Sequence, residues 1–511
     1  MAGLFKALLS LLCVFGIGAR LVPLLDATRR MAQWPTEDGY FMLTMGRNVA
    51  LGRGLSVAGG EMPTNGTQPL TTLIWALGYA TVDGDRESGV LIALVLQWIA
   101  AMLTAFAIYR LGKTIFAERS DGSNRAALAA AVWLASPVVM PHTMNCLETG
   151  FNGLIAVLVA HTYVSKDGLW SWKRTLGFGA LLGVAFWVRN DSAFLIAAAC
   201  LGYLLPALRT PEERTPRFLR VLVFGATSVA VASPWLVYNY VNFDHIMPVS
   251  GRAEALTGHF GGNLAGVPIV LAEYLMAFVP IPHSVSDSTV VVLGAAALIF
   301  AALAVLIVRR RELHVPERRL AFLVGVYLLG MAAFYGLYFG AAWFLPRYFL
   351  PLSPFLALAF SSVVFLVLGR LADRLRSILA LGGAVAMLGI IAFVGYRQYR
   401  GGTQHMHFQV VAWVEENVPE ETWIGAIQTG TLGFFHDRTI NLDGKVNIAA
   451  YEALVAGREG EYVVEDTEIQ YLADWIGMRD WLTKPVIAAN FEVVVEDEDA
   501  NLAVLRRRTP Q

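Results

Sequence analysis

The chain has 511 residues, of which 56% are hydrophobic and 15% charged, and its mean hydropathy is +0.54. Soluble globular proteins carry about 45–50% apolar and about 25% charged residues, so this composition argues against a single water-soluble domain and against a disordered chain. The formal net charge of -1 provides no basic field to hold nucleic acid. Cys13, Cys146 and Cys200 lie far apart without metal-ligand spacing, so neither a disulfide framework nor a cysteine zinc site is expected.

Eleven apolar stretches are long enough to cross a bilayer, which takes about 20 residues. They cover approximately residues 3–19, 88–109, 124–142, 147–164, 175–188, 192–208, 218–240, 288–308, 320–341, 346–369 and 377–396. Two further stretches, 69–82 and 267–282, are too short or too interrupted by proline, and we expect helices that lie at the membrane surface or dip into it. The sequence predicts an all-α polytopic membrane protein with about 11 transmembrane helices.

Basic residues set the expected orientation, because cytoplasmic loops carry an excess of Lys and Arg. If the two short stretches do not cross, Lys6 and all the basic clusters fall on one side; the clusters lie within residues 110–125, 166–174, 209–220, 309–319 and 370–376. This places the N-terminus inside and the C-terminus outside. Residues 3–19 also fit a secretory signal peptide loosely, but no small-residue cleavage site precedes Arg20, so an uncleaved first helix is expected.

Two outside regions are long. Residues 20–88 form a first extracytoplasmic loop with surface helices, including an amphipathic helix at Tyr40–Leu51. Residues 397–511 are more acidic, and apolar residues alternate with polar ones. They show a helical pattern at 407–418 and strand patterns at 422–427, 491–495 and 502–505. We therefore expect a transmembrane catalytic domain over 1–396 and a small extracytoplasmic α/β domain over 397–511.

Carboxylates gather at the predicted outer ends of the helices. Glu37 and Asp38 precede the amphipathic helix, and Glu148 opens the fourth span, with His142 and Asn145 a few residues before it. Acidic residues at helix starts can act simply as caps. The alternative is a general base or a metal site. The sequence predicts no certain cofactor, and a divalent cation held by Glu37, Asp38, Glu148 and His142 stays open.

Cations and further polar groups are predicted on the same face. Arg189 and Asp191 occupy the tight turn between the fifth and sixth spans, where they either pair with each other or bind a ligand. The remaining candidates are Arg347 and Tyr348 at the mouth of the tenth span, His245 and Arg252 in the loop after the seventh, and Asp443 in a turn of the outer domain. Guanidinium groups bind phosphate bidentately, and a carboxylate can take a proton from an attacking hydroxyl.

This pattern resembles the GT-C superfamily of polytopic membrane glycosyltransferases. The resemblance rests on "EDGYFMLTMGRNVALGRG" with "PTNGTQPLTTLIW", then "LETGF", "RNDS", "PWLVYNYVNFDHIMPVSGRA" and "PRYFLPLSPF", and on "WVEENVPEETWIGAIQTGTLGFF" and "INLDGKVN" in the tail. It implies a polyprenyl-phosphate-linked sugar as donor. It makes Asp38 the base and Glu37 an auxiliary or metal-contacting carboxylate, matches Glu148 to a second acidic position, and places Arg347, with Arg189 helping, near the lipid phosphate.

The function expected is that of an inverting glycosyltransferase in a bacterial cytoplasmic membrane, with its active site on the extracytoplasmic side. Its acceptor would be a hydroxyl of an envelope glycan, lipid or protein. The alternatives are a transporter or flippase for a lipid-linked glycan, which would often show inverted repeats and midplane charges, and a non-catalytic scaffold that binds wall polymer. The sequence leaves the sugar, the acceptor and the oligomeric state open.

Overall fold

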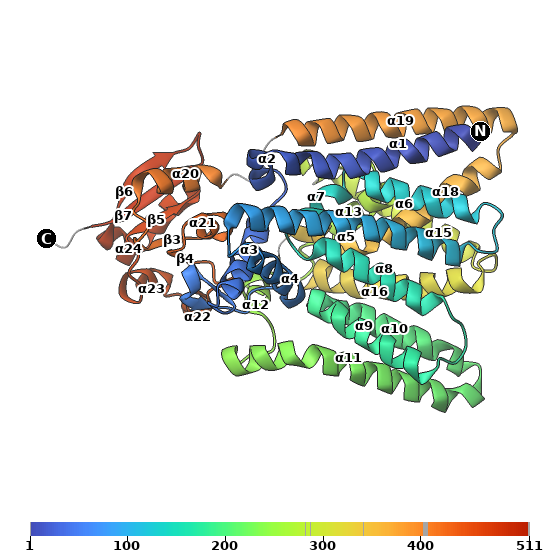
Figure 1. The fold of residues 1–511 in the computed structure, drawn as a ribbon, viewed down its shortest axis with the longest axis horizontal. Coiled ribbons are helices and arrows are strands. Elements are labelled where there is room, and N and C mark those ends of the chain that lie inside the picture. The colour runs from blue at the N-terminus through green and yellow to red at the C-terminus, as the bar shows by residue number, and fades with distance from the viewer. Residues whose placement is uncertain (1, 282, 287, 341, 402–406, 509–511) are drawn as a thin grey trace.

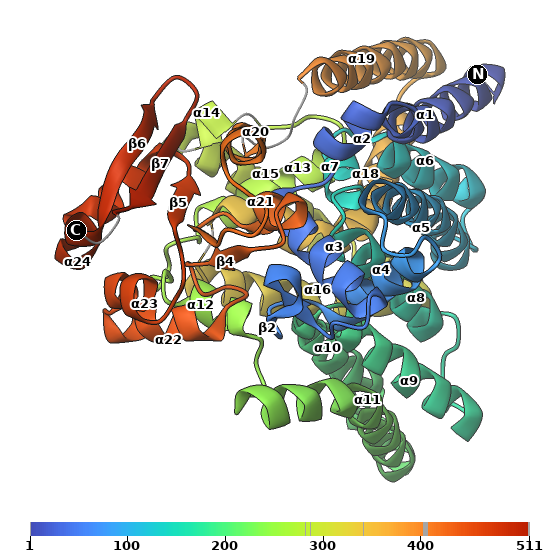
Figure 2. The ribbon, with the colours of Figure 1, turned by 60° about the vertical axis from the view of Figure 1, so that its left-hand side comes forward.

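The computed structural model describes residues 2–281, 283–286, 288–340, 342–401 and 407–508. A bundle of roughly parallel helices forms one part, and a smaller domain of strands and short helices lies against one end of it (Figure 1). Turning the molecule shows the first outer loop between these two parts (Figure 2). The chain therefore folds as a helical body with a cap.

Long helices form the body of the bundle. They are α1 (Ala2–Leu21), α5 (Arg86–Ile115), α11 (Arg214–Phe243), α15 (Thr289–Val308), α16 (Val315–Leu337), α18 (Ser353–Gly369) and α19 (Asp373–Arg400). Between them lie the shorter helices α6 (Gly122–Ala135), α7 (Val139–Thr143), α8 (Thr149–Val164), α9 (Trp172–Val188), α10 (Ala193–Leu204), α13 (Gly266–Met276), α14 (His283–Ser286) and α17 (Leu345–Phe349).

Eight of the eleven predicted spans form helices that are long and apolar enough to cross a membrane. In the part of the chain that the structure describes, they are Gly3–Leu25, Arg86–Ile115, Asn190–Leu208, Pro211–Phe243, Thr289–Val308, Val315–Leu337, Ala342–Gly369 and Asp373–Arg400. The other three predicted spans become α6, α8 and α9, of 14, 16 and 17 residues. These shorter helices contribute to the largest buried apolar core of the bundle, together with α5.

The two short apolar stretches are also helical. Residues 69–82 give α4 (Pro69–Ala80), with Pro69 in the first turn, where its missing N–H costs nothing. Residues 267–282 give α13, which packs against α15 and α18 with most of its apolar side chains buried. The second stretch therefore enters the bundle instead of lying along its surface.

The predicted basic clusters meet at one end of the bundle. Arg119 forms a bidentate ion pair with Glu317 at 2.7 and 2.9 Å. Arg319 donates to the carbonyl oxygens of Tyr163 and Lys166 at 2.6 and 2.5 Å. In Figure 1 the turns that carry these clusters lie at the end opposite the outer domain. The bundle thus has one strongly basic end and one capped end.

The segment between α1 and α5, which is predicted to lie outside and is called the outer loop here, contains α2 (Ala27–Ala32), α3 (Glu37–Ala50), α4 and the short hairpin of β1 (Ser56–Val57) and β2 (Met62–Pro63). Thr36 caps α3, because its hydroxyl accepts from the Gly39 amide at 3.2 Å. The helix α12 (Val249–Ala255) follows α11 and contacts α22 (Ile448–Ala456) of the cap. Both α3 and α12 thus stand at the junction between the bundle and the cap.

The cap is built on a five-stranded sheet with the order β4-β3-β5-β7-β6. Its strands are β3 (Ile424–Ala426), β4 (Thr439–Asn441), β5 (Tyr471–Asp474), β6 (Phe491–Asp497) and β7 (Leu502–Arg507), and its helices are α20 (Phe408–Asn417), α21 (Gly430–Phe435), α22 (Ile448–Ala456), α23 (Glu459–Glu465) and α24 (Pro485–Asn490). The predicted helix at 407–418 and the three predicted strands match α20, β3, β6 and β7. The domain boundary expected at 396 falls inside α19.

Candidate active site

A cavity of about 530 Å³ lies where the bundle meets the cap. Its walls come from α3, the start of α8, the turn between α9 and α10, α12, α16, α17 and the cap turn at 441–447. Seven ionisable side chains of Asp, Glu, Arg and Lys line it, together with two tyrosines: Asp38, Glu148, Arg189, Asp191, Glu254, Tyr335, Arg347, Tyr348 and Lys445. Residues as far apart in the sequence as Asp38 and Val446 thus line one cavity.

Asp38 and Arg347 form an ion pair across this cavity. Both side chains are partly exposed, at 24% and 18%, so a ligand can reach them. The Arg347 guanidinium also lies 3.9 Å from the centre of the Phe344 ring. Burial alone would raise the pKa of Asp38, but the positive charges of Arg347 and then of Lys445 lower it below its ordinary value. Asp38 is therefore ionised and able to accept a proton at neutral pH.

Arg189 is held by two carboxylates at once. It pairs with Glu148, and its Nη2 lies 2.8 Å from Asp191 Oδ2. Tyr335 donates its hydroxyl to the same Asp191 oxygen at 2.6 Å. The three charged side chains are only 5–7% exposed. The charge of Arg189 is already compensated, so this cluster forms a rigid wall of the cavity.

Glu37 does not line the cavity. Its carboxylate accepts hydrogen bonds from the backbone amides of Gly430 and Thr431 and from the Thr431 hydroxyl, the last two at 2.9 and 2.5 Å. His407 Nδ1 lies 3.7 Å from the same carboxylate. Adjacent residues of a helix point about 100° apart, so Glu37 and Asp38 face different partners. Glu37 thus joins α3 to the start of α21 in the cap.

Several other predicted site residues are absent from the cavity wall. Asn145 Oδ1 accepts from the Leu147 amide at 3.0 Å and organises the turn before α8. The His142 carbonyl accepts from the Thr149 hydroxyl. His245 Nδ1 accepts from the Met247 amide in its own loop at 3.0 Å. Arg252 stacks on the ring of Tyr451 at 4.6 Å.

Asp443 contacts the site through a neighbour. Its Oδ2 lies 3.6 Å from the Lys445 ammonium, and Lys445 reaches the cavity wall. Burial raises the pKa of Asp443 above its ordinary value. Asp443 therefore belongs to the edge of the site.

The four possible metal ligands do not converge. Within the described ranges, no group of three His, Cys, Asp or Glu side chains lies close enough to hold a metal ion. Glu37 faces the cap and Glu148 is bound to Arg189. Asp38 is left facing Arg347.

Three of the nine charged and tyrosine side chains that line the cavity were not predicted from the sequence. Lys445 lies two positions beyond Asp443, inside the quoted segment "INLDGKVN", and Glu254 lies two positions beyond Arg252. Tyr335 lies in an apolar span, and a polar aromatic residue there is too common to be a signal. Attention to every ionisable residue of the quoted segments would have found Lys445, whereas Glu254 lies just beyond the segment "PWLVYNYVNFDHIMPVSGRA".

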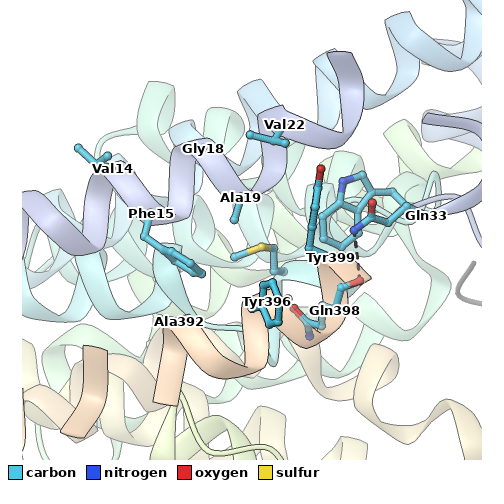
Figure 3. Close-up of a pocket in the computed structure, with 13 residues that line it drawn as sticks. Val14, Phe15, Gly18, Ala19, Val22, Gln33, Ala392, Tyr396, Gln398 and Tyr399 are labelled. Atoms are coloured by element: carbon cyan, nitrogen blue, oxygen red, sulfur yellow. Dashed lines mark hydrogen bonds between the residues drawn. The ribbon is translucent and has the colours of Figure 1, made fainter. Parts of the chain in front are cut away.

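A second pocket lies between α1 and the end of α19, and Trp34 and Met140 also line it. Figure 3 shows it walled by Val14, Phe15, Tyr396 and Tyr399, with Gln33 and Gln398 at one end. It holds about 460 Å³ and has no Asp, Glu, Lys, Arg or His in its wall. The charged cavity is the candidate active site.

These features define a polytopic membrane protein with an ionisable cavity under a cap at one end of the bundle, as expected for the GT-C fold. The profile of the family "Dolichyl-phosphate-mannose-protein mannosyltransferase" matches residues 67–238, and that of a domain of unknown function, DUF8728, matches residues 392–505. No curated protein sequence matches the chain.

Solved structures share the fold over nearly the whole chain. ArnT from Cupriavidus metallidurans, bound to undecaprenyl phosphate, is 14% identical with a TM-score of 0.59; the match covers 98% of this chain and 99% of ArnT. The oligosaccharyltransferase AglB from Archaeoglobus fulgidus, in complex with an inhibitory peptide and a dolichol-phosphate, is 14% identical with a TM-score of 0.54, covering 93% and 70% of the two chains. The resemblance to GT-C proteins is confirmed.

Proposed function

We propose that this chain is an inverting glycosyltransferase that moves a sugar from a polyprenyl-phosphate carrier to an acceptor hydroxyl at the outer face of the cytoplasmic membrane. The observation that carries the proposal is the single cavity lined by Asp38, Glu148 and Arg347, which come from separate elements. A transporter does not need a base paired with a phosphate-binding cation at one end of the bundle. A scaffold does not need an ionisable cavity beneath its cap.

The reaction is a single displacement at the anomeric carbon. The acceptor hydroxyl gives its proton to Asp38 and forms the new bond to the sugar. The bond between the anomeric carbon and the phosphate oxygen breaks, and that oxygen keeps the electron pair. Arg347 stabilises the charge that develops on the departing phosphate. Binding of phosphate to Arg347 competes with the ion pair, which releases Asp38 to act as a base.

The acceptor enters opposite the phosphate. Inversion requires the attacking hydroxyl and the leaving group to lie on opposite faces of the sugar. We assign the acceptor side to Asp38 and the donor side to Arg347 and Tyr348. The cluster of Glu148, Arg189 and Asp191 holds the turn between α9 and α10 in place and offers hydrogen-bonding atoms to the sugar hydroxyls.

The test is Asp38→Asn in the purified protein with a panel of polyprenyl-phosphate sugars. A positioned base contributes about 10²–10⁴-fold, so kcat is expected to fall by that factor while donor binding persists. Asp83→Asn is the matched control, because Asp83 is exposed, lies in a loop and has a φ of 51°, which asparagine tolerates. Transfer by Asp38→Asn at the wild-type rate would remove Asp38 as the base.

A further inference from the structure

The cap turn at 441–447 forms part of the cavity roof. Gly444 has a φ of 76°, and a Cβ there would lie 2.7 Å from the Tyr451 Cα, so only glycine fits the position. The Asp443 carboxylate accepts from the Lys445 amide at 3.0 Å and tightens the same turn. Gly66 of the outer loop packs against the backbone of Lys445 and Val446. The turn is therefore fixed from both sides, and it aims Lys445 at the cavity.

The ammonium of Lys445 lies among carboxylates on the cavity wall. Its Nζ is 3.3 Å from Glu254 Oε2 and 3.6 Å from Asp443 Oδ2. Burial disfavours its charge, but Asp443, Asp38 and Glu254 outweigh burial and raise the pKa of the amine above its ordinary value. Lys445 is therefore a fixed positive charge at every physiological pH.

Lys445 and Arg347 approach the same aromatic ring. The Lys445 Nζ lies 5.9 Å from the centre of the Phe344 ring, and the Arg347 guanidinium carbon lies 3.9 Å from it. One cation belongs to the bundle and the other to the cap, so both parts of the protein place a positive charge beside this ring of the cavity wall.

The three cations of the cavity differ in how open they are. Arg189 is 7% exposed and saturated by two close carboxylates. Lys445 is 29% exposed, and its carboxylate contacts are longer. A lysine ammonium also sits on a flexible stem with three donors that reorient toward a ligand. Lys445 can exchange a carboxylate for a phosphate oxygen, whereas Arg189 cannot do so without exposing two buried charges.

We propose that Lys445 and Arg347 together bind the phosphate of the lipid carrier, so that the cap supplies half of the cationic site for the leaving group. This inference rests on the proposed glycosyltransferase function. It assigns the cap to the donor side of the reaction, in addition to any contact with the acceptor.

The negative charge of the phosphate increases during transfer, so a second cation, Lys445, can stabilise the departing group. The donor is a phosphodiester with one negative charge. The departing polyprenyl phosphate is a monoester, which carries about -1.5 to -2 at pH 7. A cation that gains interaction as this charge develops lowers the barrier. Loss of Lys445 is thus expected to weaken binding of the monoester product more than binding of the diester donor.

The experiment measures binding of undecaprenyl phosphate and of undecaprenol to the purified full-length protein in nanodiscs. Lys445→Gln is expected to weaken undecaprenyl phosphate binding 10–100-fold and to leave undecaprenol binding unchanged, since the alcohol carries no charge. Lys445→Arg should restore binding to within a few-fold. Lys484→Gln is the matched control, because Lys484 pairs with Glu459 elsewhere in the cap and is absent from the cavity wall.

A fourth variant keeps the proposal testable if Lys445→Gln destabilises the cap. Glu254→Gln removes a carboxylate that competes for the ammonium, so it should tighten undecaprenyl phosphate binding several-fold. A merely structural role of the pair predicts no gain. Unchanged or weaker phosphate binding by Glu254→Gln overturns the proposal in that case.

Arg347→Gln distinguishes failure of the Lys445 assignment from failure of the proposed glycosyltransferase function. If Arg347→Gln loses undecaprenyl phosphate but a folded Lys445→Gln does not, the Lys445 assignment is wrong and the transferase proposal stands. If the wild-type protein binds undecaprenyl phosphate no better than undecaprenol, the phosphate site fails altogether, and the proposed function fails with it.

Discussion

Glu37 and Asp38 are neighbours in the sequence, but they have different partners in the structure. Asp38 faces Arg347 across the cavity, whereas Glu37 accepts hydrogen bonds from the first amides of α21. The turn of the helix separates the two carboxylates, and each environment then gives its carboxylate a separate task. The two adjacent carboxylates therefore have different environments: Asp38 lines the cavity and is the base that we propose, whereas Glu37 bonds to the cap.

The positive charge of Lys445 is expected to influence the pKa of Asp38. Asp38 acts as a base only when ionised, so kcat/KM falls as the pH drops through its pKa. Lys445 lowers that pKa, and Lys445→Gln should therefore raise it and move the acid limb of the pH profile to higher pH. The measurement is kcat/KM against pH for the wild type, Lys445→Gln and Lys445→Arg. An acid limb at the same pH in all three would contradict the coupling.

At the scale of elements, two of the polar contacts that join the outer loop to the cap differ in how deeply they are buried. The first is the buried bond between Glu37 and the start of α21. The second is Asp437, which contacts Arg47, Arg53 and Arg86 at 3.4, 3.4 and 2.7 Å but is 36% exposed. Exposed ion pairs contribute about 0.2–1 kcal/mol each, whereas leaving a buried polar group unsatisfied costs about 1–3 kcal/mol. The buried Glu37 should therefore stabilise the junction more than the three partly exposed ion pairs of Asp437.

Substitution of each residue tests this ranking. Glu37→Gln replaces a carboxylate that accepts three hydrogen bonds, and we expect it to destabilise the junction by about 3 kcal/mol. Asp437→Asn should cost about 1 kcal/mol. Hydrogen exchange at the amides of α21 reads out the opening of the junction directly. Faster exchange in Asp437→Asn than in Glu37→Gln would reverse the ranking.

Helix lengths show how elements depend on their surroundings. The predicted span at 124–142 is divided into α6 and α7, since Pro137 disfavours a helical conformation at Ser136. The Pro234 inside α11 does not divide that helix, which continues from Arg214 to Phe243. Proline in the sequence therefore marks a possible break, and the packing around it decides whether the helix ends.

At the scale of the whole molecule, the bundle has two chemically different ends. At one end, Arg119, Arg220 and Arg319 each bond to a residue of another helix or turn, and the cap covers the other end. The rule that places basic loops in the cytoplasm then puts the cap and the cavity outside. The orientation stays a prediction.

Cysteine labelling of intact cells tests the orientation in a background without Cys13, Cys146 and Cys200. Glu312→Cys lies in the exposed basic turn between α15 and α16, and Gly477→Cys lies at an exposed and uncrowded position of the cap. A membrane-impermeant maleimide should label the protein with Gly477→Cys in intact cells, but the protein with Glu312→Cys only after permeabilisation. Labelling in the opposite pattern would place the cavity in the cytoplasm.

The sequence by itself determined the helical membrane class, the basic end, the α/β tail and the identity of Asp38, Glu148, Arg189, Asp191 and Arg347 as residues of one cavity. It could do so because the length of each apolar segment and the charge of each loop are local properties of the sequence, and these properties govern how a helix inserts into a bilayer. The tertiary structure decided that Glu37 faces the cap, that Arg189 is saturated, and that Lys445 and Glu254 complete the wall. These facts depend on which elements pack together across hundreds of residues, and no local pattern of the sequence encodes such a contact.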